Sequence, residues 1–197
     1  KLQGSKYVQS SIRDAYNRVL DHLRSGRLVL FTGTPCQIGG LKAYLGADYS
    51  NLITADVICH GVPSQAFFKD YIGCLESELG GRVIDFRFRD KSCGSPGYIA
   101  KIVYKKNGMV LEKLMPWFTS YYYDYFLKGH ILRDSCYECM YTHGSRPGDI
   151  SIGDYWGVQT FHPELDTSNG VSLLLINTEK GMSLIEGLAR MVSLVES

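Results

Sequence analysis

Two predicted strands alternate with two predicted helices over residues 27–79, and this alternation limits the possible folds more than any other feature. Residues 27–31 and 52–59 are apolar runs that predict short buried strands. Residues 36–45 and 64–79 predict helices. Strand, helix, strand and helix joined by short connections are typical of a parallel βαβ unit. The sequence therefore predicts that the chain begins with a parallel sheet.

The pattern changes beyond residue 80. Residues 82–90 alternate between polar and apolar positions, and residues 98–116 predict a hairpin that turns at Asn107–Gly108. Further helices are predicted at residues 7–24, 120–129 and 180–195, and further strands at residues 149–157 and 171–178. We therefore predict a mixed α/β fold with a parallel βαβ start, an antiparallel middle and helices packed around a mixed sheet. A single domain over residues 1–197 is expected.

The composition excludes several classes of protein. With 45% hydrophobic residues, the 197-residue chain can bury a full core. Its 21 basic and 20 acidic residues give no basic excess, which argues against binding to nucleic acid. No apolar run is long enough to span a membrane, and no signal-peptide pattern follows Lys1, so a cytoplasmic protein is expected. The absence of an initial Met favours an internal piece of a longer protein.

The six cysteines do not suggest a disulfide framework. A chain of this size has a core and needs no covalent cross-links, so its cysteines are more often metal ligands or redox groups. Cys74 lies at core spacing in a predicted helix and Cys93 in a loop rich in Ser and Gly, so we interpret neither as a ligand. The other four lie at element boundaries or in turns: Cys36, Cys59, Cys136 and Cys139.

The turn before the second predicted helix contains the first of these cysteines. Thr34 is expected to be the N-cap, Pro35 the first helical residue, and Gln37 the partner in a capping box. Cys36 then lies in the first helical turn, where the helix dipole favours a thiolate. Ligands bind at the carboxyl ends of parallel strands, so Gly33, Thr34, Pro35 and Gln37 are candidate cofactor-binding residues. A buried cysteine beside an ordinary capped helix fits the same pattern.

Two glycines lie inside this predicted helix. Gly39 and Gly40 each weaken the helix by about 1 kcal/mol relative to alanine, unless another group packs closely against them. Their presence in a helix this short is otherwise unfavourable.

The spacing of the four cysteines allows one inorganic centre. If the first two predicted strands are neighbours, Cys36 and Cys59 leave the sheet at one edge, with strands about 4.8 Å apart. Cys136 and Cys139 form a C-x-x-C pair that can bind a metal or a cluster from a tight turn. Four cysteines match the ligand count of a 4Fe–4S cluster and of a structural zinc site, and the pair alone could be a redox dithiol. These alternatives remain open.

Six stretches of the chain, in order, resemble the C-terminal domain of the coenzyme F-420 hydrogenase/dehydrogenase beta-subunit family. They are GSKYVQS, LFTGTPCQIGGLKAYL, NLITADVICHGVPS, FRFRDK, RDSCYECMYTHGSRPGDISIGDYWG and GVSLLLINTEKG. The resemblance implies a flavin and iron–sulfur redox protein with FAD, one 4Fe–4S cluster and, in some members, coenzyme F-420. It also implies that Cys36, Cys59, Cys136 and Cys139 bind the cluster.

The same resemblance implies how the protein works with others. Family members pass electrons between a hydrogenase, formate dehydrogenase or other reductase partner and a hydride carrier. They carry a small N-terminal domain ahead of GSKYVQS, which this chain lacks, so the chain alone is expected to be inactive if the flavin needs that domain. The predicted function is an electron-transfer oxidoreductase, and the alternative is a structural zinc-binding interaction domain without redox activity.

Other polar residues in these motifs are candidate contacts of an anionic cofactor, because phosphate groups bind basic side chains. They are Ser5, Lys6, Arg89, Lys91 and Arg133. The charge of Arg133 could tune a nearby cluster. His60, beside Cys59, is a candidate for proton transfer near a flavin. Solvated basic residues and a structural histidine fit the pattern equally well, and Arg146 and Asp149 are expected to form an ion pair.

Overall fold

In a computed structural model, the chain divides into two units, each with its own β-sheet. The structure describes residues 5–90, 92, 98–168 and 170–196. Unit 1 comprises Lys1–Ser10 and His60–Glu138, and unit 2 comprises Ser11–Cys59 and Cys139–Ser197. The chain therefore leaves unit 2 directly after Cys59 and returns to it at Cys139. The expectation of a single domain stays a prediction.

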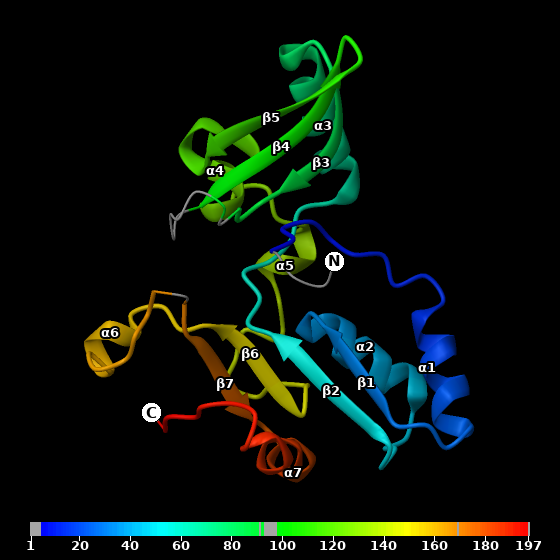
Figure 1. The fold of residues 1–197 in the computed structure, drawn as a ribbon. Helices are drawn as coiled ribbons and strands as arrows, with labels where there is room; N and C mark the ends of the chain where they lie inside the picture. The colour runs from blue at the N-terminus through cyan, green and yellow to red at the C-terminus, as the bar shows by residue number, and fades with distance from the viewer. Residues whose placement is uncertain (1–4, 91, 93–97, 169, 197) are drawn as a thin grey trace. The chain divides into compact units, whose positions relative to one another are not determined.

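Unit 2 is built on a four-stranded mixed sheet with the order β1-β2-β6-β7 (Figure 1). Its strands are β1 (Val29–Gly33), β2 (Leu52–Val57), β6 (Ile150–Asp154) and β7 (Ser172–Ile176). The first three run parallel and β7 runs antiparallel to β6, which confirms the predicted mixed sheet with a parallel start. The helices of this unit are α1 (Ala15–Arg24), α2 (Pro35–Leu45), α6 (Val158–Phe161) and α7 (Glu179–Leu188).

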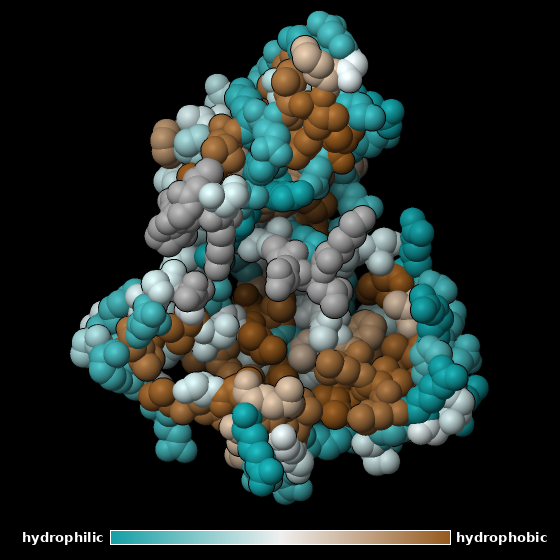
Figure 2. Space-filling view, viewed as in Figure 1, coloured by the Kyte–Doolittle hydropathy of each residue, from teal (hydrophilic) through white to brown (hydrophobic). Residues whose placement is uncertain are grey.

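The prediction that the first strand is fully buried is wrong for one of its faces. Val29 and Phe31 pack against α1 and α2, but Leu30, on the opposite face, is 61% exposed. β1 is an edge strand, and both residues on its second face, Leu30 and Thr32, are exposed. Figure 2 shows apolar side chains gathered over the strands of this unit.

Unit 1 contains the predicted antiparallel middle as a sheet of its own, with the order β3-β4-β5. Its strands are β3 (Arg82–Arg87), β4 (Ile99–Lys106) and β5 (Met109–Pro116). Its helices are α3 (Gln65–Leu79), η1 (Trp117–Thr119), α4 (Tyr121–Leu127) and α5 (Asp134–Tyr137). Asn107 and Gly108 both have positive φ, at 52° and 79°, and this confirms the predicted hairpin turn.

An aromatic core holds unit 1 together. Tyr122, Tyr123 and Phe126 of α4 are almost fully buried against the sheet and Leu75 of α3. The N-terminal segment joins this core, because Tyr7 stacks on Phe126 with ring centroids 4.7 Å apart.

Two predicted helices are shorter than the sequence suggested. The helix expected at residues 7–24 begins only at Ala15, because residues 5–10 belong to unit 1 and Arg13 has a positive φ of 45°. The helix expected at residues 180–195 ends at Leu188, and residues 189–196 after it are exposed. No helix within the described parts of the chain is long and apolar enough to cross a membrane.

Candidate functional site

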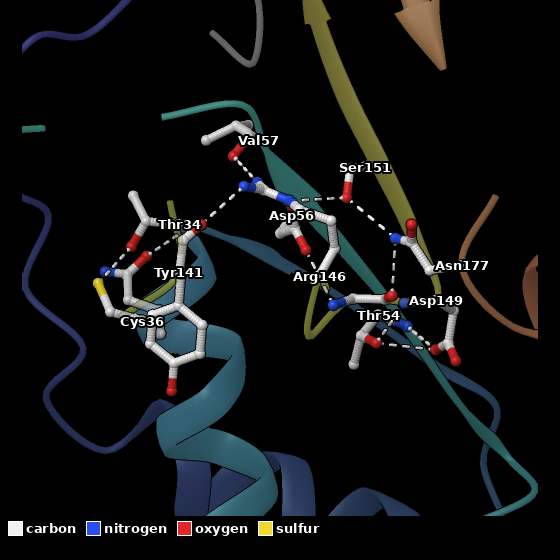
Figure 3. A network of polar contacts seen from close by, with 12 residues as sticks. Thr34, Cys36, Thr54, Asp56, Val57, Tyr141, Arg146, Asp149, Ser151 and Asn177 are labelled. Atoms are coloured by element: carbon white, nitrogen blue, oxygen red, sulfur yellow. Dashed lines mark hydrogen bonds and ion pairs between the residues drawn. The ribbon is translucent and has the colours of Figure 1, made fainter. Parts of the chain in front are cut away.

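The turn that contains Cys36 has the predicted geometry. Thr34 is an extended N-cap with a ψ of 158°, Pro35 begins α2, and the capping box is present. The Thr34 backbone N–H donates to Gln37 Oε1 at 2.9 Å, and Thr34 Oγ1 lies 3.1 Å from Cys36 Sγ (Figure 3). Cys36 is exposed, so the alternative of a buried cysteine is wrong.

Gly33 allows this turn to close. A Cβ atom at Gly33 would lie 2.8 Å from Gln37 Oε1 and 3.2 Å from Gln37 Cβ. Any side chain there would therefore displace the glutamine that caps α2. Gly33, Thr34, Pro35 and Gln37 thus build the turn, and their role in binding a cofactor stays a prediction.

The register of β1 and β2 relates Cys36 to Cys59. The two strands are parallel neighbours, and Gly33 pairs with Asp56. Cys36 follows Gly33 by three residues and Cys59 follows Asp56 by three residues. Both cysteines therefore follow the carboxyl ends of neighbouring parallel strands, each three residues after a member of the same strand pair. Cys59 is exposed like Cys36, so neither is enclosed in packed hydrocarbon.

The two glycines of α2 are contact points for tyrosines. A Cβ atom at Gly39 would overlap the Tyr141 hydroxyl and lie 2.7 Å from its Cζ atom. A Cβ atom at Gly40 would lie 2.8 Å from the Tyr16 hydroxyl. Tyr141 follows Cys139 by two residues, so Gly39 lets the segment after the C-x-x-C pair lie directly on the helix that contains Cys36.

A buried ion pair connects the same segment to β2. Arg146 Nη2 lies 2.5 Å from Asp56 Oδ1, and the two side chains are 9% and 0% exposed. Arg146 also donates hydrogen bonds to three other residues (Figure 3). They run from Nη2 to the Val57 carbonyl oxygen at 2.8 Å, from Nη1 to the Tyr141 carbonyl oxygen at 3.1 Å, and from Nε to Ser151 Oγ at 3.2 Å. The expected pairing of Arg146 with Asp149 is wrong, because Asp56 of the neighbouring strand takes that position.

Asp149 instead connects three elements of unit 2. Its Oδ2 atom accepts from the Thr54 N–H at 2.7 Å and from Thr54 Oγ1 at 2.8 Å. Its Oδ1 atom accepts from Thr178 Oγ1, in the N-cap of α7, at 2.8 Å. Burial by itself would raise the pKa of Asp149, but the hydrogen bonds from Thr54 and Thr178 outweigh it and lower the pKa below 3.8.

The candidates in unit 1 make local contacts. His60 Nε2 lies 3.1 Å from the Phe126 carbonyl oxygen, which can only accept, so Nε2 carries the proton and donates it. Arg133 is the N-cap of α5, and its backbone carbonyl oxygen accepts from the Cys136 N–H at 2.8 Å. Cys136 Sγ lies 4.0 Å from the Val62 carbonyl oxygen. The proposed roles of His60 and Arg133 stay predictions.

The remaining cofactor candidates among the described residues all belong to unit 1. The Arg89 guanidinium lies over the ring of Tyr98, 5.4 Å from its centroid. Ser5 is half-buried and Lys6 is exposed. Lys91 lies outside the described residues. Their assignment to a cofactor stays a prediction.

The cysteines suit a metal centre in their chemistry. Cys36, Cys59 and Cys139 belong to unit 2 and Cys136 to unit 1, and all four are outside disulfide bonds and exposed or half-buried. Four such thiols are the donor set of a 4Fe–4S cluster. Within the described ranges, no group of three or more His, Cys, Asp or Glu residues is arranged to hold a metal ion.

The interpretation of Cys74 as a core residue is wrong, because it is exposed on α3.

Sequence reasoning missed the role of Asp56. A charged residue inside an apolar strand has to be paired if it is buried, so Asp56 in LITADVIC signalled a buried partner. It did not identify Arg146, which is 90 residues away along the chain.

A comparison with protein families agrees with the motif-based resemblance. The family model for the C terminus of the coenzyme F-420 hydrogenase/dehydrogenase beta subunit matches residues 26–196. No curated protein matches the chain. This family match gives the chain an oxidoreductase-related role connected with coenzyme F-420, and membership among beta subunits implies a partner in a hydrogenase or dehydrogenase complex. The chain belongs to the coenzyme F-420 hydrogenase/dehydrogenase beta-subunit family and corresponds to its C-terminal region.

Proposed function

We propose that the chain binds one 4Fe–4S cluster through Cys36, Cys59, Cys136 and Cys139 and relays electrons between a redox partner and a hydride carrier, FAD or coenzyme F-420. The observation that supports this most is the register of β1 and β2, since Cys36 and Cys59 follow paired residues by the same number of positions. Cys136 and Cys139 are separated by only two residues in the C-x-x-C pair, which suits adjacent ligands of one cluster.

Each cysteine environment has a part in this proposal. When bound, the cluster would supply one-electron transfer and the flavin would supply hydride transfer. A ligand thiol is deprotonated, so in the contact between Thr34 Oγ1 and Cys36 Sγ the hydroxyl would donate. Hydrogen bonds to ligand sulfurs tune the reduction potential of a cluster. Thr34 would therefore both shape the turn and adjust the potential.

We also propose contacts to the hydride carrier. Lys6, Arg89 and Arg133 could balance its phosphate charges. The hydrogen bond from His60 Nε2 to Phe126 leaves Nδ1 as the ring nitrogen that could exchange a proton with a flavin. A fluorescence titration of FAD into the chain and into a Lys6→Ala variant tests the first contact, and equal affinities would exclude it.

Serine variants test the cluster ligands. The chain and its single Cys→Ser variants are purified and reconstituted without oxygen, and iron, sulfide and zinc are measured together with the visible absorbance. We expect each variant of a proposed ligand to lose the cluster, whereas Cys74→Ser retains it because Cys74 is an exposed helical residue. A complete cluster in Cys36→Ser or Cys59→Ser contradicts the proposal. Bound zinc without sulfide supports the structural zinc domain instead.

A further inference from the structure

We propose that Arg146 is a positioning residue that fixes the segment containing Cys139 relative to the end of β2, from which Cys59 follows. This inference rests on the proposed cluster function. It concerns unit 2 alone, since Arg146, Cys59 and Cys139 all belong to that unit.

A single guanidinium contacts both segments close to the cysteines. On one side, Arg146 Nη1 donates to the carbonyl of Tyr141, two residues after Cys139. On the other side, Nη2 donates to the carbonyl of Val57, two residues before Cys59, at 2.8 Å. Figure 3 shows the Arg146 side chain extended between these two carbonyls. The spacing of the two segments is therefore set by one planar group.

The contacts use the particular geometry of arginine. Nε and Nη2 both donate to Asp56 Oδ1, at 3.1 and 2.5 Å, while Nε also contacts Ser151 Oγ. The carbonyl oxygens of Tyr141 and Val57 accept hydrogen bonds from further N–H groups of the same planar guanidinium. Lysine has one compact ammonium group and cannot reproduce this set of directions. A lysine at position 146 would keep the charge but lose the fixed spacing.

The loop after Arg146 closes over the same carboxylate. The Gly148 N–H donates to Asp56 Oδ2 at 2.8 Å, and a Cβ atom at Gly148 would lie 2.7 Å from that oxygen. Asn177 Nδ2 donates to the Gly148 carbonyl and to Ser151 Oγ, both at 3.0 Å. Both carboxylate oxygens of Asp56 therefore accept hydrogen bonds from the segment after Cys139: Oδ1 from Arg146 and Oδ2 from Gly148. These bonds fix the carboxylate in its position opposite Arg146.

A neighbouring contact separates positioning from simple stabilisation. Thr178 Oγ1 donates to Asp149 and caps α7, so Thr178→Ala removes a hydrogen bond from the same unit. None of the contacts that the structure gives for the Thr178 side chain involves the segments next to Cys59 or Cys139. Thr178→Ala is thus the matched control for a loss of stability alone.

The experiment compares the intact chain, Arg146→Lys and Thr178→Ala after anaerobic reconstitution with iron and sulfide. The rate of cluster loss to a chelator and the EPR spectrum of the reduced protein are measured, together with thermal unfolding of the apoproteins. We expect Arg146→Lys to weaken cluster retention by about 10-fold to 100-fold, as other substitutions around metal ligands do, and to alter the EPR spectrum. Thr178→Ala should lower the unfolding temperature and leave both cluster readouts unchanged.

Each outcome separates the two proposals. If the intact chain assembles no cluster, the proposed function fails. If it assembles a cluster that Arg146→Lys retains with the same rate and spectrum, only the positioning role fails. An equal change in Thr178→Ala also overturns that role. If Arg146→Lys does not fold, Asp56→Asn tests the same contact. Its one amide oxygen can still accept from Arg146, but the ionic partner is lost and the amide nitrogen replaces the oxygen that accepts from the Gly148 N–H, so a change in the same direction is expected.

Discussion

Replacement of the two glycines of α2 by alanine tests how closely the segment after Cys139 lies on this helix. Alanine favours a helix over glycine by about 1 kcal/mol, and this gain is the same at both positions. At Gly40 the added methyl meets only the end of a side chain, the Tyr16 hydroxyl at 2.8 Å. The hydroxyl would give up its 2.7 Å bond to the Gln37 carbonyl, which costs about 1 kcal/mol. We therefore expect Gly40→Ala to be nearly neutral.

Gly39→Ala should be clearly worse. The methyl would overlap the Tyr141 hydroxyl and approach Cζ to 2.7 Å, so the whole end of the ring has to move. Overpacking of this kind costs about 1–3 kcal/mol, and the helix gain removes about 1 kcal/mol of that cost. The net loss in the free energy of unfolding should be about 1 kcal/mol, measured by urea unfolding of the apoprotein.

A second substitution identifies the cause. Tyr141→Ala removes the ring, so Gly39→Ala in that background should stabilise the chain by its helix propensity alone. If Gly39→Ala is instead as stable as Gly40→Ala with Tyr141 present, the close approach of the segment to α2 is refuted.

Three further predictions concern the fold. The pKa of Asp149 is lower in the folded chain than its ordinary value of 3.8, so its carboxylate stabilises the fold above that pH and loses this contribution as the pH falls below it. Asp149→Asn should therefore be less stable at neutral pH and lose less stability between pH values of about 5 and 2 in acid unfolding. Gly108→Ala should destabilise the hairpin by about 1 kcal/mol in urea unfolding, because alanine is strained at a φ of 79°. Leu30→Ser should change the free energy of unfolding by less than about 1 kcal/mol, since Leu30 is 61% exposed, and a larger loss would contradict the open face of β1.

Local signals in the sequence predicted local structure well. The Asn107–Gly108 hairpin and the capping box of Thr34 and Gln37 depend on residues a few positions apart, so the sequence contains all the information they need. The parallel pairing of β1 and β2 also followed from the alternation of strands and helices.

The contacts between distant segments could not be predicted in this way. Gly39 signalled that a group packs against α2, but Tyr141 lies about a hundred residues further along the chain, and helical spacing does not identify it. Cys74 matched the core spacing of α3, yet it is exposed. The spacing of apolar residues shows which side of a helix is buried, but it does not show how much of that side is covered by neighbouring elements. The open face of β1 has the same origin, because an apolar run does not say whether both faces are covered.

The content of iron and acid-labile sulfide in the intact chain, purified without oxygen, tests the central claim most directly. One 4Fe–4S cluster held by the four cysteines predicts about four iron and about four sulfide atoms per chain, together with a brown colour. One tightly held zinc ion per chain without sulfide, or a chain that takes up no metal after anaerobic reconstitution, would contradict it.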